Sequence, residues 1–222
     1  MKYLILLSLI SGLAQGATCP DVSADQLGIE YVNQKGFGQA SWRVWRQPNR
    51  IAYEYPGKGL IEIWQLKQEK VEFIRVFSQE KRGIYYSYGD LRSINQSPDW
   101  QQVNQMLPPN RRSQLGKATK QEDNCFHYQH YQQNGQLSLT WNQDLNVPTL
   151  IVNLEKKQRI QQRELFSSKQ SQDFFSQVDQ YDLLDFADIG DSEADPFVRR
   201  MIKLGYVNHG NNNNYPNSSH QH

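Results

Sequence analysis

Three side chains that could bind a metal or transfer protons lie close together near the middle of the chain. Cys125, His127 and His130 are residue types that commonly hold zinc. If this segment is a β-strand, Cys125 and His127 share one face and His130 points to the other, because successive side chains alternate. One metal could bind all three only across a bulge, so we expect no metal site here. A polar tail is the simpler explanation for the remaining histidines, His209, His220 and His222.

A second group of candidate ligands is an acidic segment between Asp185 and Asp195. Its carboxylates invite a calcium hypothesis, but their spacing departs from the calcium-loop pattern of aspartates, a central glycine and a final glutamate. The alternative is that they flank the start of the last helix, where negative charge is favoured by the helix dipole.

Covalent catalysis has no clear candidate in the sequence. The Gly-x-Ser-x-Gly elbow of serine hydrolases is absent, and Cys125 has a structural explanation given below. No pair of carboxylates stands out for glycoside chemistry. We therefore expect a protein that is not an enzyme and that needs no cofactor.

The two cysteines, Cys19 and Cys125, are expected to form a disulfide in an oxidising compartment. Closing a loop of about 100 residues would contribute about 4–5 kcal/mol in the chain-entropy model. The alternative is that Cys19 is lipidated directly after an export signal. Residues 16–18, Gly-Ala-Thr, lack the aliphatic and small residues expected at the −3 and −1 positions of such a site.

Residues 1–16 have the features of a secretory signal: one lysine, a short apolar run and small residues at Ala14 and Gly16 before the cleavage point. The apolar run is too short to span a membrane. We therefore expect a protein exported to the periplasm that is not an integral membrane protein.

The charges are balanced once this signal is removed. Its loss takes Lys2 from 24 Lys+Arg against 23 Asp+Glu, which leaves 23 of each sign. A nucleic-acid partner is therefore not expected, because affinity for nucleic acid depends on a concentrated basic surface. The sequence also contains no long polybasic run that would hold an anionic membrane.

Aromatic and β-branched residues alternate with polar ones in short runs separated by turn residues, which is typical of antiparallel strands. With tight turns such as Pro48-Asn49 and Asn134-Gly135 between them, we count about nine strands. They fall in the ranges 42–47, 51–55, 60–66, 71–77, 83–88, 125–131, 137–141, 149–154 and 159–166. Residues 28–40 are rich in glycine and polar residues and are expected to lead into the first strand.

Helical patterns interrupt and follow these strands. After the fifth strand, Ser97-Pro98 predicts a helix start, with Trp100, Val103 and Met106 at helical spacing before Pro108-Pro109. We divide the chain into the signal, a β domain at residues 17–170, a helical extension at 171–208 that packs on the sheet, and a disordered polar tail at 209–222. In the extension, Asp195-Pro196 predicts the start of the last helix and Gly205 its end.

These elements predict an α+β fold that is mainly antiparallel β: a curved, unclosed β-barrel of about nine strands with a helical insertion and C-terminal helices. A sheet of this size encloses more volume than its own side chains fill, so we expect an apolar cavity between sheet and helices. The residues we expect to line it, chosen from periodicity, are Trp45, Tyr53, Ile63, Trp64, Phe73, Trp100 and Trp141.

Two segments resemble the periplasmic lipoprotein-carrier superfamily of the LolA, LolB and RseB type. The first is the basic-x-Pro turn in residues 45–55, followed by a strand ending near Trp64. The second is the proline turn in residues 141–151, and the resemblance as a whole covers residues 42–166. The chain differs from this pattern in having Gly57-Lys58-Gly59 where a Ser-Asp-Gly turn is usual, and in carrying the helical extension.

The resemblance implies a half-barrel whose mouth is plugged by helices and whose cavity accepts acyl chains or lipidated proteins. The leading interpretation is an exported periplasmic protein that holds a lipid acyl chain or a lipoprotein, with helix displacement as the gate. The alternative is a cell-envelope protein-interaction module whose cavity is filled by its own helices.

Overall fold

The computed structural model describes residues 18–107 and 109–207. The expected signal peptide and polar tail lie outside these residues.

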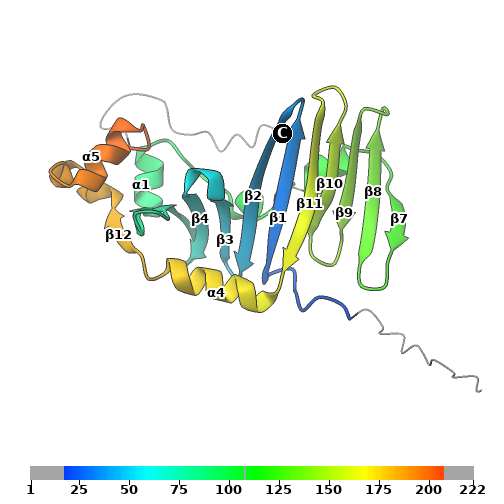
Figure 1. Cartoon of the computed structure of the whole chain (residues 1–222), viewed down its shortest axis with the longest axis horizontal. Helices are drawn as coiled ribbons and strands as arrows, with labels where there is room; N and C mark the ends of the chain where they lie inside the picture. Colours follow the sequence, from blue (N-terminus) through cyan, green and yellow to red (C-terminus); the bar gives the residue numbers. More distant parts are fainter. Residues whose placement is uncertain (1–17, 108, 208–222) are drawn as a thin grey trace, which may run out of the picture.

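The described residues form a single sheet of twelve strands, in the order β12-β6-β5-β4-β3-β2-β1-β11-β10-β9-β8-β7 (Figure 1). It is curved and unclosed, and all neighbouring strands are antiparallel except β12 and β6. The strands are β1 (Leu27–Lys35), β2 (Gly38–Gln47), β3 (Arg50–Tyr55), β4 (Leu60–Lys67), β5 (Lys70–Phe77), β6 (Arg82–Tyr86), β7 (Thr119–Glu122), β8 (His127–Gln133), β9 (Leu137–Asn142), β10 (Val147–Asn153), β11 (Gln158–Phe166) and β12 (Asp182–Asp185).

The sheet consists of two meanders. Strands β1 to β6 follow one another across one half and β7 to β11 across the other, and β1 pairs with β11 to join them. The pairing is shifted between Glu30 and Tyr31, because β11 carries an extra residue there, Arg163, that has no partner on β1. Mainly antiparallel strands with helices confirm the predicted α+β class.

All nine predicted strands are present, and three more were missed. Residues 28–40 form most of β1 and the start of β2 rather than a lead-in. The other two are the four-residue edge strands β7 and β12. Strand β12 lies within residues 171–208, which were predicted to be helical, because the chain after the preceding helix pairs with β6.

In the part of the chain that the structure describes, five α-helices lie against the sheet: α1 (Tyr88–Ser93), α2 (Trp100–Val103), α3 (Pro109–Ser113), α4 (Ser168–Val178) and α5 (Pro196–Lys203). Three short 3₁₀ turns complete them: η1 (Pro56–Lys58), η2 (Phe186–Asp188) and η3 (Gly190–Ser192).

The helix termini agree only partly with the predictions. Asp99, not Ser97, caps α2, because its carboxylate accepts the backbone N–H of Gln101 at 2.8 Å. At the last helix the prediction is confirmed: Asp195 caps α5 through the N–H of Phe197, and Gly205 follows the helix with φ +74°. Leu204, between the end of α5 and Gly205, is exposed.

The two faces of the sheet are covered differently. On one face, here called the α4 face, helix α4 packs Phe175 and Val178 against Trp45 and Ile63. The opposite face, here called the insertion face, carries the helices that interrupt or follow the strands. There α1 and α5 pack on β4 to β6, and the segments around α2 and α3 pack on the other strands.

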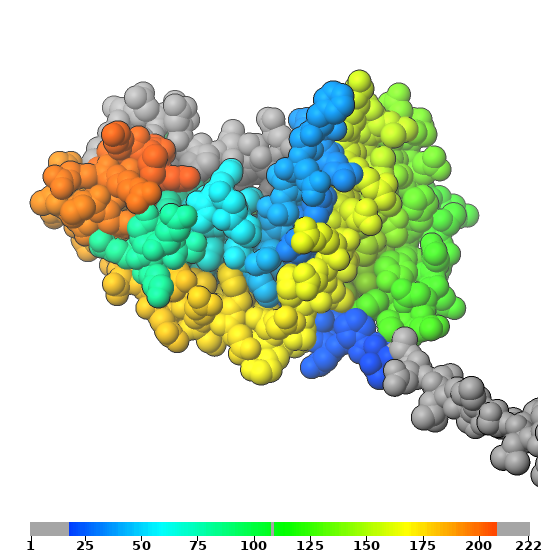
Figure 2. Space-filling view, viewed as in Figure 1, coloured from blue at the N-terminus to red at the C-terminus, as the bar shows by residue number. Residues whose placement is uncertain are grey.

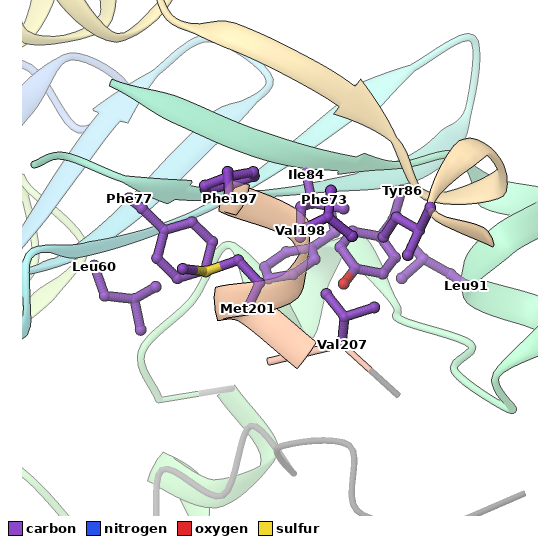
Figure 3. Packing of buried hydrophobic residues seen from close by; sticks show 11 residues of the cluster. Leu60, Phe73, Phe77, Ile84, Tyr86, Leu91, Phe197, Val198, Met201 and Val207 are labelled. Atoms are coloured by element: carbon purple, nitrogen blue, oxygen red, sulfur yellow. The ribbon is translucent and has the colours of Figure 1, made fainter. Parts of the chain in front are cut away.

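Helix α5 fills the insertion face over β5 and β6. Phe197, Val198 and Met201 are buried against Phe77 and Ile84 (Figure 3). The burial of these apolar side chains holds the C-terminal segment to the sheet, because hydrophobic burial is the main favourable contribution to packing.

Candidate ligand-binding site

An apolar cavity of about 290 Å³ lies on the insertion face, between the α3 segment and strands β8 to β11. Its apolar lining comes from both the sheet and the helical insertion, and consists of Leu107, Leu115, Leu137, Leu139 and Ile151. The volume is just below the range of about 300–1,000 Å³ found for small-molecule sites.

Strand register explains the sheet side of this lining. Leu139 on β9 pairs with both Tyr131 on β8 and Ile151 on β10, so the three side chains form one row across the insertion face. The next row contains Leu137, which pairs with Gln133 and Asn153. The first row is apolar and the second is mixed, so the cavity becomes more polar toward the β8–β9 turn.

Helix α3 and the residues that flank it, from Leu107 to Leu115, close the cavity from the other side. Leu115 is buried against the cluster formed by Tyr131, Leu139 and Trp141. The guanidinium of Arg112 lies 4.0 Å from the centre of the Trp141 ring. Burial lowers the pKa of Arg112 from its ordinary value, yet the aromatic face attracts the cation, so this contact fixes the segment over the strands.

Polar and cationic side chains line the rim. Arg111 and Lys156 contribute charge. Gln158 is buried and donates to the Asn33 side chain at 3.2 Å, while Gln133 donates to the Gln114 carbonyl at 3.5 Å. An apolar cavity with a cationic rim suits a ligand with an apolar body and an anionic or polar end.

The structure divides the seven predicted lining residues between the two faces, and none lines this cavity. Trp45 and Ile63 lie on the α4 face. The Trp45 ring stacks on Phe174 at 4.6 Å and on Phe166 at 5.0 Å, so it is enclosed by the protein's own side chains. Ile63 and Trp64 are neighbours in β4 and necessarily point to opposite faces.

The other predicted residues lie on the insertion face, where the chain itself covers them. Trp64 and Phe73 are cross-strand neighbours with ring centres 4.4 Å apart. Tyr53 donates to the Val103 carbonyl at 3.2 Å, and burial raises its pKa to about 12. Trp100 packs on the central cluster, and Trp141 lies in the cluster that adjoins the cavity.

A buried arginine that sequence reasoning missed anchors the insertion. Arg46 is 3% exposed and its guanidinium donates to four backbone carbonyls, those of Ala24, Asn104, Leu145 and Asn146, at 3.1–3.5 Å. Burial lowers its pKa. Alternation along β2 places Arg46 on the insertion face, but nothing in the sequence indicates the three separate loops that converge on it.

Cys19 and Cys125 form the predicted disulfide, with Cα atoms 5.4 Å apart. His127 turns to Asp144, whose carboxylate accepts the His127 backbone N–H at 2.6 Å and lies 3.2 Å from Nδ1. His130 contacts Thr140 instead. Within residues 18–107 and 109–207, no cluster of three or more His, Cys, Asp or Glu side chains is arranged to hold a metal ion.

No protein-family model matches the sequence, and no curated protein matches it. Solved structures of MucB do match. The complex of Pseudomonas aeruginosa MucA/MucB has a TM-score of 0.30 and 11% identity, over 64% of this chain and 52% of that chain. MucB in complex with MucA(peri) gives 0.29 and 12%, over 65% and 52%.

The chain thus spans about half the length of the MucB chains it matches. MucB is of the RseB type, a type that the sequence also resembles, and both likenesses are weak. Scores this low say nothing about the function of the chain. In the part of the chain that the structure describes, no helix is both long and apolar enough to cross a membrane.

Proposed function

We propose that this chain is a non-catalytic, exported envelope protein that holds an acyl chain of a lipid or lipoprotein in the cavity under α3. The observation that carries the proposal is the apolar lining of that cavity, which includes Leu115, Leu139 and Ile151, with the exposed Arg111 at its rim. Burial of apolar ligand surface there would contribute about 25 cal/mol per Å².

The disulfide supports export. Cys19 and Cys125 are paired, and disulfides persist mainly in oxidising compartments such as the periplasm. The pairing also argues against lipidation of Cys19, because its sulfur is already bonded.

A gate would be needed for a ligand longer than the cavity. Further apolar surface lies on the same face: Tyr53 and Phe73 are buried there, and Trp64 is half-buried. A longer ligand would reach it only if α2 and α5 moved away from the sheet. Lid movements of this kind are common at binding sites. In this proposal the cavity under α3 takes the ligand first.

The test is native mass spectrometry of the full chain purified without detergent, followed by addition of a fluorescent fatty acid. The proposal predicts a bound lipid mass or saturable uptake at one site per chain. Neither a lipid mass nor uptake, from protein with the intact disulfide, would overturn it.

A second function is favoured by α5. Because Phe197, Val198 and Met201 already fill the face over β5 and β6, the chain also fits an envelope protein-interaction module whose cavity is filled by its own helices. Failure to take up any lipid would favour this second candidate.

A further inference from the structure

We propose that one end of the sheet docks on the surface of an anionic lipid bilayer. This surface, here called the hairpin end, consists of the β1–β2 turn (residues 35–38), the β8–β9 turn (residues 133–137) and the β10–β11 turn with the first residues of β11 (residues 153–159). It does not depend on the proposed function, since an empty cavity would leave the hairpin end unchanged.

The three turns lie side by side although they are far apart in the sequence. The Gly36 N–H donates to the Lys157 carbonyl at 3.1 Å, and the Leu154 N–H donates to the Gln136 carbonyl at 2.8 Å. In Figure 1 these turns form the upper edge of the sheet, and in Figure 2 the blue β1–β2 hairpin projects there beside its yellow neighbour. The turns therefore present one continuous surface.

Apolar side chains project from two of these turns. Four large hydrophobic residues are exposed among those that the structure describes, and two of them, Phe37 and Leu154, belong to the hairpin end. Phe37 is fully exposed at the tip of its turn, and Leu154 is 61% exposed. Exposed aromatic and aliphatic side chains next to basic ones are typical of surfaces that insert into the headgroup region of a bilayer.

Basic side chains surround these apolar tips. Lys35, Lys157 and Arg159 are exposed, and none of them takes part in an ion pair within the described residues. Lys156 adds a further positive charge, and Glu155 is the one acidic residue of the three turns. Each basic residue near an anionic membrane contributes about fivefold to binding. This cluster of basic side chains could not be predicted from the sequence, because Lys35 lies next to the others only through the pairing of β1 with β11.

The identity of the partner follows from this combination. An acidic protein would match the charges of the hairpin end but would not explain why Phe37 is exposed. A neutral apolar partner would not match the positive charges of Lys35, Lys157 and Arg159. An anionic bilayer provides both a negative surface and an apolar interior within reach. Gln133, Asn153 and Lys156 of the hairpin end also line the cavity, so docking would bring the cavity next to the lipid.

The test is co-sedimentation of the full chain with vesicles of phosphatidylcholine containing phosphatidylglycerol, compared with phosphatidylcholine alone. We expect binding to the anionic vesicles that weakens as salt is added. Lys35→Gln with Arg159→Gln should weaken binding about 30-fold, and Phe37→Ser with Leu154→Ser by about tenfold or more. All four side chains are exposed, and circular dichroism and the melting temperature confirm that each variant folds.

The matched control is Lys67→Gln with Lys70→Gln, in the β4–β5 turn at the opposite end of the strands, which should leave binding unchanged. Equal binding to both vesicle types, or hairpin-end variants that bind like the control, would overturn the proposal. So would a dimer in solution that Phe37→Ser dissociates, since the hairpin end would then be covered by a second copy. Loss of fatty-acid uptake with vesicle binding intact would reject only the proposed function.

Discussion

Arg82 and Asp195 form a two-point ion pair, with nitrogen–oxygen distances of 3.1 and 2.8 Å. Asp195 also caps α5, and the Arg82 guanidinium lies 4.5 Å from the centre of the Phe197 ring. One carboxylate therefore starts the helix and ties it to β6. The pair thus adds a polar contact to the apolar packing that holds α5 on the insertion face.

This ion pair predicts acid sensitivity. The hydrogen bond from Arg82 holds the pKa of Asp195 below its ordinary value of 3.8. A lowered folded-state pKa gives stability that is present above the unfolded value and is lost as the pH falls through the folded value. The melting temperature of the native chain should therefore fall more steeply below pH 3.8 than that of Asp195→Asn. The same scan with Asp191→Asn, a neighbouring exposed carboxylate, should follow the native curve, and identical curves for all three would contradict the prediction.

Replacement of Arg46 is expected to lower the stability of the fold strongly. Arg46→Met leaves the carbonyls of Ala24, Asn104, Leu145 and Asn146 buried without this donor, and the free energy of unfolding should fall by about 3 kcal/mol or more. Urea unfolding followed by tryptophan fluorescence measures it. Arg199→Met, at an exposed position of α5, should change it by no more than about 0.5 kcal/mol. Equal effects would show that Arg46 does not anchor the insertion.

A side chain at position 28 is expected to clash with its neighbours on the α4 face. A Cβ at this position would lie 2.4 Å from the Trp45 ring, which is itself held between Phe166 and Phe174. Gly28→Ala should therefore destabilise the fold by about 1–3 kcal/mol or more. Gly38→Ala, where the nearest atom is 3.5 Å away, is the matched control. Thermal melts of the two variants that coincide would reject the tight packing of β1 on Trp45.

The disulfide predicts stability that depends on oxidation. Cys19 and Cys125 are 106 residues apart, so the double change Cys19→Ser with Cys125→Ser should lower the free energy of unfolding by about 4–5 kcal/mol in the chain-entropy model. Denaturant unfolding with and without reductant gives the same comparison in the native chain. The native chain should show no reactive thiol, and a titratable thiol at Cys125 would contradict the pairing.

Local patterns predicted most of the fold because each strand carries its own alternation and its own turn. Asn134-Gly135 predicted the β8–β9 hairpin, and Asp195-Pro196 predicted the start of α5, from residues next to each other. Strand β1 was missed because residues 33–35 are polar and Gly28 interrupts the apolar run. In β12, four residues give too little periodicity, and its parallel pairing with β6 arises only from the tertiary fold.

The site was harder to predict because it depends on which residues meet across the sheet. Leu137, Leu139 and Trp141 alternate on one face, a signal that was present in the sequence. The list of lining residues nevertheless included neighbours such as Ile63 and Trp64, which the pleat must separate. The position of α3, and therefore the cavity itself, depends on long-range contacts such as Arg112 on Trp141.

The most direct test of the account is a titration of the full chain and of Leu137→Trp with a fluorescent fatty acid. Leu137 lines the cavity, so the larger indole should occupy part of its volume, and we expect at least tenfold weaker uptake with an unchanged circular dichroism spectrum. Leu204→Trp, at an exposed position beside α5, should bind as the native chain does. Equal affinity for native and Leu137→Trp chains would show that the cavity under α3 does not hold the ligand.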